Sequence, residues 1–299
     1  MIILKRLKVF IFNALILTVT SLILRILGTF FGVYISNKIG EEALGVFGLI
    51  MSVYVFGITL ASSGINLSCM RIVSEELAKG NEYLAKKAAQ RCTTISFICG
   101  ICASLFLFIN SNFIVDYCFH NKVHNNIVYL ICIALPFTAV SSSINGYFSA
   151  VRRVYKSSIT QVIEQLTKYI ASFYLLSLFT SNTLEGSCYA LILGDVISEI
   201  VSMVFIYILY YFDKRNKKFT YARNSASLNK RILTISFPLA ITSYIRSALS
   251  TLKQILIPKG LEKSGLKCEI ALSNYGIIGG MAMLIILFPS LFISSLVAF

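Results

Sequence analysis

The sequence predicts an all-α fold, a polytopic bundle of membrane-spanning helices. Of its 299 residues 57% are hydrophobic, and the mean hydropathy is +0.78. Only 13% are charged, whereas soluble domains carry roughly 25%. Long apolar runs recur along the chain, each sufficient for the ~20 helical residues that cross a bilayer core. Because lipid cannot hydrogen-bond to an exposed backbone, we expect these runs to be helices.

The apolar runs predict eight spans separated by short polar segments. The first run follows the basic segment of Lys5, Arg6 and Lys8 and is much longer than the apolar core of a signal peptide, so we interpret it as a retained span. The predicted spans are residues 9–36, 43–68, 92–110, 125–150, 157–180, 184–212, 228–257 and 270–299.

The basic residues orient these spans. With the N-terminus in the cytoplasm, 18 of the 27 Lys and Arg residues fall on cytoplasmic segments and five on outer loops. This asymmetry follows the positive-inside rule. It predicts a multi-pass plasma-membrane protein, and it accounts for the net charge of +14 through topology and anionic lipid headgroups, without nucleic acid.

Seven ionisable residues fall inside the predicted spans. Each costs on the order of 2.5–3.5 kcal/mol at mid-bilayer, so such residues are candidates for function. Several share helical stripes with small polar residues, which favours a position facing the protein interior or a watery cavity. The seven are Arg25, Glu164, Lys168, Asp195, Glu199, Arg246 and Lys253.

Two pairs among these residues suggest ion pairing or coupling of transport to an ion. Glu164 and Lys168 lie four residues apart in the favourable order for a structural ion pair along one helix. Asp195 and Glu199 are also four apart but carry like charges, so they need a neighbouring cation or a proton. Structural locking and coupling to a monovalent cation or a proton are both open.

The intramembrane arginines suggest an anion-binding cavity. Neither Arg25 nor Arg246 has an acid three or four residues away on its own helix. One alternative is that each braces an acid on a neighbouring helix, such as Asp195. The other is that their guanidinium groups bind phosphate. Ser21 and Gly28 lie on the stripe of the first arginine. The stripe of the second contains Ser236, Ser243, Ser250 and Lys253.

Sequence motifs for other chemistry are absent. The chain contains no phosphate-binding loop, no H-E-x-x-H zinc motif and no G-x-S-x-G nucleophile elbow. The "CGIC" segment at 99–102 lies in an apolar run, where small residues three apart indicate close helix packing. We therefore expect no enzyme activity, no cofactor and no metal site.

Two segments of the chain repeat. The first span begins after "LKRLK", carries an arginine and leads into "ALGVFGLIMSV"; the seventh begins after "LNKRIL", carries an arginine and leads into "ALSNYGIIGGM". A displacement of six spans preserves orientation, so the repeats would be parallel and related by an axis along the membrane normal. The predicted domains are a six-helix lobe at 1–220 and the start of a second lobe at 221–299.

These segments also resemble a known family. The chain is similar to the stage V sporulation protein B group of the multidrug/oligosaccharidyl-lipid/polysaccharide exporter superfamily, which includes lipid II flippases and MATE antiporters. The segments that carry the resemblance are "RILGTFFGVYISNKIGEEALGVFGLIMSVY", "GINLSCMRIVSEELAKGN", "NGYFSAVRRVYKSSITQVIEQLTKY", "IPKGLEKSG" and "LSNYGIIGGM". The chain departs from the family pattern at two places. It has "GIN" where the family commonly has G-x-P, and "NGYFSA" where the family usually has Arg-Gly-Tyr-Phe-Gln-Gly.

The resemblance implies a MATE-like fold of two lobes around a central cavity. It implies a flippase that moves a polyprenyl-diphosphate-linked saccharide or peptidoglycan precursor for cell-wall, polysaccharide or spore-cortex synthesis. Lipid II flippases have essential cavity arginines in the first and seventh helices, at positions that match Arg25 and Arg246. Because the family has at least twelve spans, we expect an incomplete chain. The alternatives are a cation-coupled multidrug exporter, a non-transporting scaffold and a polyprenyl-phosphate glycosyltransferase, for which the outer loops are too short.

Overall fold

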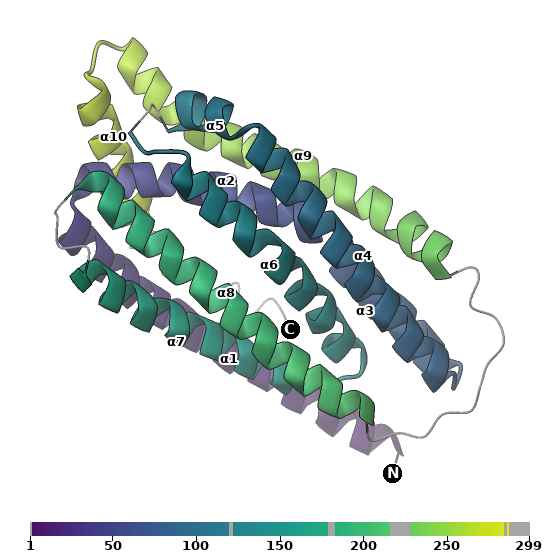
Figure 1. Ribbon diagram of the computed structural model, residues 1–299. Helices are drawn as coiled ribbons and strands as arrows, with labels where there is room; N and C mark the ends of the chain where they lie inside the picture. Colours follow the sequence, from purple (N-terminus) through teal and green to yellow (C-terminus); the bar gives the residue numbers. More distant parts are fainter. Residues whose placement is uncertain (1, 120–121, 179–182, 216–227, 284–285, 287–299) are drawn as a thin grey trace.

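The computed structural model describes residues 2–119, 122–178, 183–215, 228–283 and 286, and every regular element among them is a helix (Figure 1). The elements are α1 (Ile2–Ile39), α2 (Glu41–Ser62), α3 (Ile65–Ala78), α4 (Glu82–Ile109), α5 (Ser111–Cys118), α6 (Asn126–Ala150), α7 (Val154–Leu178), α8 (Leu184–Arg215), α9 (Leu228–Lys263), α10 (Cys268–Gly276) and the π-helix η1 (Ile277–Ala282).

Six segments of the described chain are long and apolar enough to cross a membrane, and they match six of the eight predicted spans. They are Thr18–Ile39, Glu41–Ala78, Glu82–Ile109, Asn126–Ala150, Leu184–Asp213 and Leu228–Lys263. The predicted span 157–180 is helix α7, which the charges of Lys156, Glu164 and Lys168 make less apolar. The predicted span 270–299 begins with α10 and η1, but most of its later part lies outside the described residues.

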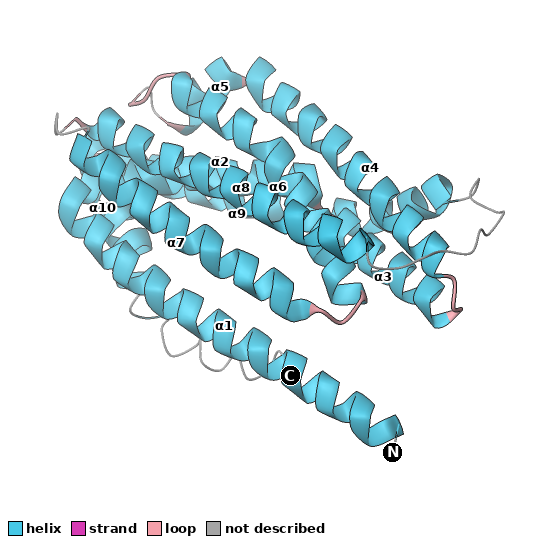
Figure 2. Ribbon diagram, turned by 60° about the horizontal axis from the view of Figure 1, so that its bottom comes forward, coloured by secondary structure: helices cyan, strands magenta, loops and turns pink. Residues whose placement is uncertain are grey.

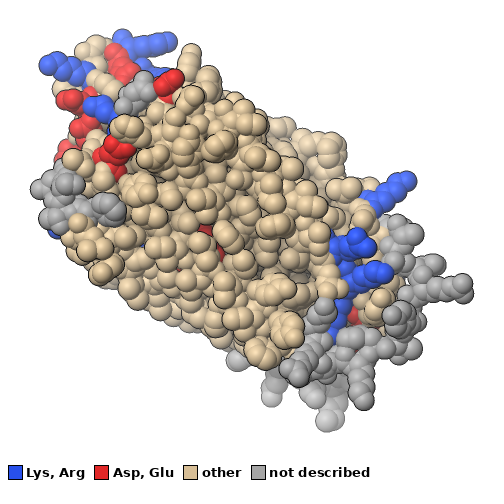
Figure 3. Space-filling model, in the orientation of Figure 1, with Lys and Arg blue, Asp and Glu red and all other residues tan. Residues whose placement is uncertain are grey.

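The charged side chains gather at the two ends of the bundle, and the broad band between them is almost entirely uncharged on the face shown in Figure 3. One end carries the N-terminus and the α3–α4 and α6–α7 turns, whose cations include Lys79, Arg152 and Arg153. We call it the basic end. The opposite end carries both acids and bases, among them Glu41 and Lys263. An uncharged belt of this kind suits contact with lipid.

The second span is broken in the middle at Gly64. There the chain takes a φ of +77°, which glycine adopts without strain, and α2 gives way to α3. A Cβ at this position would also overlap the carbonyl oxygen of Ser236 on α9. The glycine therefore serves two purposes, a left-handed turn and a close approach of backbones, and the break needs no proline.

Helix α6 forms the centre of the bundle. It packs on α4, α8, α3 and α2, and twelve or more of its side chains are buried, including Ile131, Leu135 and Ile144. Helices α7 and α8 pack along each other, and α1 lies on the outer side of α7 (Figure 2). The α1–α7 contact includes the rings of Phe31 and Tyr169, whose centroids are 4.3 Å apart.

Helices α2 and α10 meet backbone to backbone. A Cβ added to Gly45 would overlap the carbonyl oxygen of Leu272, and a Cβ added to Gly276 would overlap the carbonyl oxygen of Glu41. Nearby, Gly48 faces the ring of Tyr275 at 3.3 Å from its Cβ position. Small residues permit this approach, as is common between membrane helices. The second and eighth predicted spans, which the repeat pairs with each other, are thus in direct contact.

Candidate functional site

A cluster of charges, one buried and three half-buried, lies where residues of α2, α7 and α8 come together. Lys168 Nζ on α7 lies 2.6 Å from Asp195 Oδ1 on α8, and the side chain of Asp195 is only 4% exposed. The second carboxylate oxygen, Oδ2, has no hydrogen-bond partner among the described residues. A buried carboxylate with one close ammonium group is stabilised only while that partner stays in place.

Two further carboxylates complete this cluster. Glu164 accepts a hydrogen bond from the Ser202 hydroxyl at 2.8 Å, and Glu199 accepts one from the Tyr54 hydroxyl at 3.3 Å. Glu199 is within electrostatic range of the other two acids and of Lys168. The described residues therefore place three carboxylates beside one ammonium group. In a low-dielectric interior this excess of negative charge has to be neutralised by protons or by a further cation.

The sequence singled out the four charged residues of this cluster as candidates, but it did not predict which of them pair. The expected ion pair was Glu164 with Lys168 along one helix, whereas Lys168 pairs across helices with Asp195. Tyr54 and Ser202 were not predicted as members. Ser202 follows Glu199 by three residues, so the polar stripe of α8 was a usable signal. Tyr54 stands in an apolar run and gave no such signal.

The predicted cavity residues of α1 lie on a half-buried stretch. Arg25, Ser21 and Gly28 are all of intermediate exposure. The backbone carbonyl of Arg25 accepts a hydrogen bond from the Thr29 hydroxyl at 3.0 Å, and a Cβ at Gly28 would lie 3.6 Å from the hydroxyl of Tyr169. This stretch of α1 therefore packs mainly against α7.

The predicted cations of α9 lie on its exposed side. Tyr244 donates a hydrogen bond to the carbonyl of Leu60, and Thr251 donates one to the carbonyl of Ser52, so these two residues face α2. Arg246 and Lys253 each come two residues later, about 200° further around the helix, and both are exposed. The structure places these cations away from α2, on a helix whose main neighbours are α2, α3 and α10. The shared cleft of Arg25 and Arg246 stays a prediction.

The polar stripe predicted on α9 divides between two environments. Ser236 is buried and donates a hydrogen bond to the Ser68 hydroxyl of α3 at 2.8 Å, whereas Arg246, Ser250 and Lys253 are exposed. The contact face rotates along this 36-residue helix, which contains Pro238 and Pro258. A stripe drawn at fixed spacing therefore does not stay on one side.

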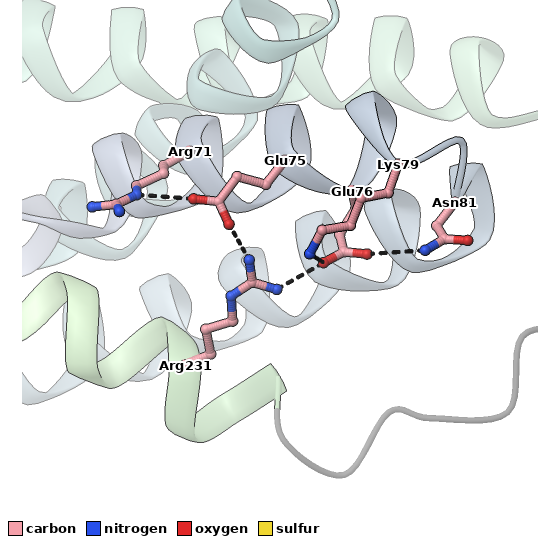
Figure 4. A network of polar contacts seen from close by, with 6 residues as sticks. All are labelled: Arg71, Glu75, Glu76, Lys79, Asn81 and Arg231. Atoms are coloured by element: carbon pink, nitrogen blue, oxygen red, sulfur yellow. Dashed lines mark hydrogen bonds and ion pairs between the residues drawn. The ribbon is translucent and has the colours of Figure 1, made fainter.

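An ion-pair network joins α3 to α9 at the basic end (Figure 4). Arg231 on α9 donates to Glu76 Oε1 at 2.7 Å and also to Glu75, both on α3. Glu76 is 6% exposed and also contacts Lys79 and Asn81. We call the Arg231, Glu75 and Glu76 contacts the α3–α9 latch. The sequence treated Arg231 only as a topology signal, because its partners are about 155 residues away.

At the opposite end a lysine joins the loop before α6 to α2 and α10. Lys122 Nζ lies 3.0 Å from Glu42 and 3.5 Å from Glu269. The hydrogen bond to Glu42 is the largest influence that raises the pKa of Lys122 above its usual value. The α2–α3 segment is thus linked near its start to α10, through Lys122, and near its end to α9, through the α3–α9 latch.

The "CGIC" segment packs as expected for small residues in a helix. A Cβ at Gly100 would lie 2.8 Å from Cα of Pro136 on α6, so α4 and α6 touch closely there. Cys99 is half-buried and Cys102 is exposed. Among the described residues no group of three or more His, Cys, Asp or Glu side chains is arranged to hold a metal ion.

Comparison with known proteins places these features in a family. Residues 10–298 match the model of the polysaccharide biosynthesis protein family. The chain is 23% identical over 294 residues to stage V sporulation protein B of Bacillus subtilis (strain 168), covering 97% of this chain and 57% of that protein. It is also 23% identical over 212 residues to the lipid II flippase MurJ of the same organism, covering 67% and 38% of the two chains.

Solved structures share the fold. A MOP superfamily transporter from Pyrococcus furiosus, described as having a binding pocket of reversed polarity, superposes with a TM-score of 0.64 at 14% identity, covering 88% of this chain and 62% of that one. A MATE transporter in the straight conformation superposes with a TM-score of 0.62 at 15% identity, covering 96% and 63%.

The chain spans less than 60% of the length of the curated relatives it matches. Its helices, its apolar segments and the transporters that share its fold show a multi-pass membrane protein with a MATE-like helical bundle. The match to the family model extends over nearly the whole sequence. The chain belongs to the polysaccharide biosynthesis protein family.

Proposed function

We propose that this chain forms part of a flippase that moves a polyprenyl-diphosphate-linked saccharide or peptidoglycan precursor across the plasma membrane. The observation that carries the proposal is the family match over residues 10–298, together with a relative named as a lipid II flippase. The chain would supply a six-helix lobe at 1–220 and the first two helices of a second lobe at 221–299. Transport needs no catalytic centre and no cofactor in this proposal.

The direction of insertion is part of this proposal. The basic end would face the cytoplasm, because cytoplasmic loops carry an excess of Lys and Arg. Arg25, Lys168, Arg246 and Lys253 would then lie within the bilayer. Two lobes related by an axis along the membrane normal would meet at the α2–α10 contact, where matching elements of the repeat touch.

In this proposal the anionic diphosphate binds the intramembrane cations while its lipid tail stays in the bilayer. Guanidinium offers several N–H donors in a planar fork that matches phosphate oxygens. Arg25 would provide this fork on α1, with Ser21 and Gly28 leaving room for the headgroup. The exposed Arg246 and Lys253 support the same role on α9.

Complementation of a flippase-deficient strain by the gene that encodes this chain tests the proposal. We expect Arg25→Ala to abolish precursor translocation while the protein level is unchanged, and Arg25→Lys to reduce it, since a point charge replaces a fork. Lys38→Ala, an exposed cation at the end of the same helix, is the matched control and should translocate normally.

Two results would count against the anion role of Arg25. Full translocation by Arg25→Ala would exclude it. Parallel loss of protein and activity would show instead that Arg25 braces a neighbouring acid.

The buried acid cluster supports a second element of the proposal, coupling to a monovalent cation or a proton. Three carboxylates face one ammonium group, so uptake and release of a cation can accompany a conformational change. The same cluster would serve a cation-coupled multidrug exporter, the alternative that also fits the MATE-like fold.

Proteoliposomes with an imposed proton or sodium gradient would test coupling. Glu199→Gln should make transport insensitive to the gradient, and Asp116→Asn, an exposed acid on α5, should leave the sensitivity intact. Equal gradient dependence in both variants would exclude the cluster. Transport of cationic drugs without any effect on precursor would favour the exporter.

A further inference from the structure

A groove runs along the bundle between α4 and α8 near the basic end. Both helices pack on α6, which lies between them (Figure 1) and closes the groove at the back. Two adjoining cavities occupy the groove. The larger one, of about 480 Å³, lies against one stripe of α4 and one stripe of α8. The other, of about 220 Å³, lies closer to the basic end, between α3, α4, the end of α6 and Asp213 of α8.

The larger cavity is amphiphilic. Phe97, Val140 and Met203 provide apolar walls, and the remaining lining residues bear hydroxyl or amide groups. These polar residues are Gln90, Thr93, Thr94, Tyr207, Tyr210 and Tyr211. Tyrosines concentrate in membrane proteins at the depth of the headgroups, where one side of the ring is apolar and the other is wet. The volume is within the range of sites that hold small molecules.

The cavity nearer the basic end is lined by two cations and two carboxylates, and Lys156 beside it adds a third cation. Lys86, Arg153, Glu82 and Asp213 line it. The Asp213 carboxylate already accepts from Arg153, from Lys156 at 2.6 Å and from the Tyr147 hydroxyl at 3.0 Å. Among the lining residues the charges balance, and only with Lys156, which bonds to Asp213 from outside the lining, does the group carry an excess of one positive charge. The Arg153 side chain is 42% exposed and has five N–H donors to share.

The two cavities together match one anionic amphiphile. Tyr147 lines the charged cavity and Tyr210 the larger one, and their rings meet edge to face with centroids 5.0 Å apart. They form the boundary between the two compartments. Basic pockets between membrane helices at the basic end of a bundle are a recognised form of site for anionic lipid headgroups.

We propose that the α4–α8 groove binds one anionic membrane phospholipid. Its phosphodiester lies at Lys86 and Arg153, where its single charge cancels the excess of one, its glycerol region lies beside the tyrosines, and an acyl chain packs on Phe97 and Met203. The site lies on the outer wall of the lobe, on helices that carry none of the predicted cavity cations, so it is independent of the proposed substrate pathway.

Native mass spectrometry of the purified chain released from nanodiscs would test the site. The discs contain phosphatidylglycerol and phosphatidylcholine in equal amounts with identical acyl chains. We expect the chain to retain phosphatidylglycerol preferentially. Arg153→Gln should weaken this retention about fivefold, and combination with Lys86→Gln by a further factor of about five, because each interfacial cation contributes comparably.

Two more variants separate the site from general electrostatic attraction. Arg91→Gln removes an exposed cation from α4 that lines neither cavity, and it should change retention less than twofold. Thr94→Trp fills the groove from an exposed position and should reduce retention of both lipids without removing a charge. Thr94→Trp therefore still tests lipid binding in the groove if the Lys86→Gln substitution at a buried position unfolds the chain.

Three outcomes would overturn the proposal. One is equal retention of the two lipids by the unaltered chain. Another is unchanged retention in Thr94→Trp. The third is displacement of phosphatidylglycerol by an equimolar polyprenyl phosphate, which would assign the groove to an isoprenoid tail. None of these measurements depends on translocation, so failure here leaves the proposed transport function untouched.

Discussion

Replacing Arg231 with glutamine should release the first turns of α9 from α3. The guanidinium donates to two carboxylates, one of them on Glu76, which is 6% exposed. A hydrogen bond to a charged group contributes about 1.5–3 kcal/mol when buried. Because the Arg231 side chain is 31% exposed, solvent screening reduces the total to about 2 kcal/mol. This corresponds to about a 30-fold rise in the open population.

Hydrogen exchange of the amides in residues 232–236, the first of α9 that bond within the helix, measures that opening. Leu228 and Ile232 at this site are buried, so closed molecules should protect these amides well. Arg231→Gln should speed their exchange about 30-fold by the arithmetic above. Lys230→Gln removes an adjacent exposed cation and should change the exchange less than twofold.

A double-mutant cycle identifies the partner. If the latch exists, Arg231→Gln and Glu76→Gln should be strongly non-additive, since each removes the same contact. Additive effects of the two substitutions, or equal exchange in Arg231→Gln and Lys230→Gln, would refute the reasoning. The α3–α9 seam would then be held by its apolar contacts alone.

Three other predictions test separate features. Lys168→Met should lower the melting temperature strongly because breaking a buried pair costs about 3–5 kcal/mol, and adding Asp195→Asn should restore much of the loss; a double variant no more stable than the single one would show that the two do not pair. Gly276→Ala should destabilise the chain because the new Cβ would meet the backbone of α2. Gly260→Ala, whose Cβ would have nothing within 4 Å, should be neutral or stabilising by up to ~1 kcal/mol. Similar melting temperatures for these two variants would contradict the close contact at Gly276. Lys122→Gln should be less stable than the unaltered chain at pH 8. The difference in stability should vanish as the pH rises through the raised pKa of Lys122, because a cation with a raised pKa contributes stability only while it is protonated. A difference in stability that persists above that pH would contradict the ion pair.

The helices were predictable because their cause is local. Length and apolar content decide whether a segment crosses a membrane, and both are read directly from the sequence. Even the less apolar α7 was recognisable, since its charges fall on one polar stripe with Thr160 and Thr167. The proposed boundary near residue 220 lies in 216–227, outside the described residues, and stays a prediction.

The pairing of charges was not predictable because its cause is the rotation of one helix about its axis relative to another. Lys168 can reach an acid four residues earlier on its own helix or one on α8, and only the packing of α7 on α8 decides between them. The same holds for Arg231, whose partners are on a distant helix. The Gly64 break was hidden because nothing in the residues "GIN" distinguishes a turn from a flexible point in a continuous helix.

The glycine contact between α2 and α10 has a mechanical consequence for the long helix that precedes it. A tilt of α9 and α10 against α2 would turn about this close backbone contact, which can therefore act as a fulcrum. Helix α9 has 36 residues and at 1.5 Å per residue is a rod of about 54 Å. A tilt of about 10° at the fulcrum would sweep the opposite tip of such a rod through about 9 Å, which exceeds the reach of any single side chain. The contacts of the α3–α9 latch lie at that tip, farthest from the fulcrum, so a few ion pairs there restrict the tilt of α9 more than the same number would near α10.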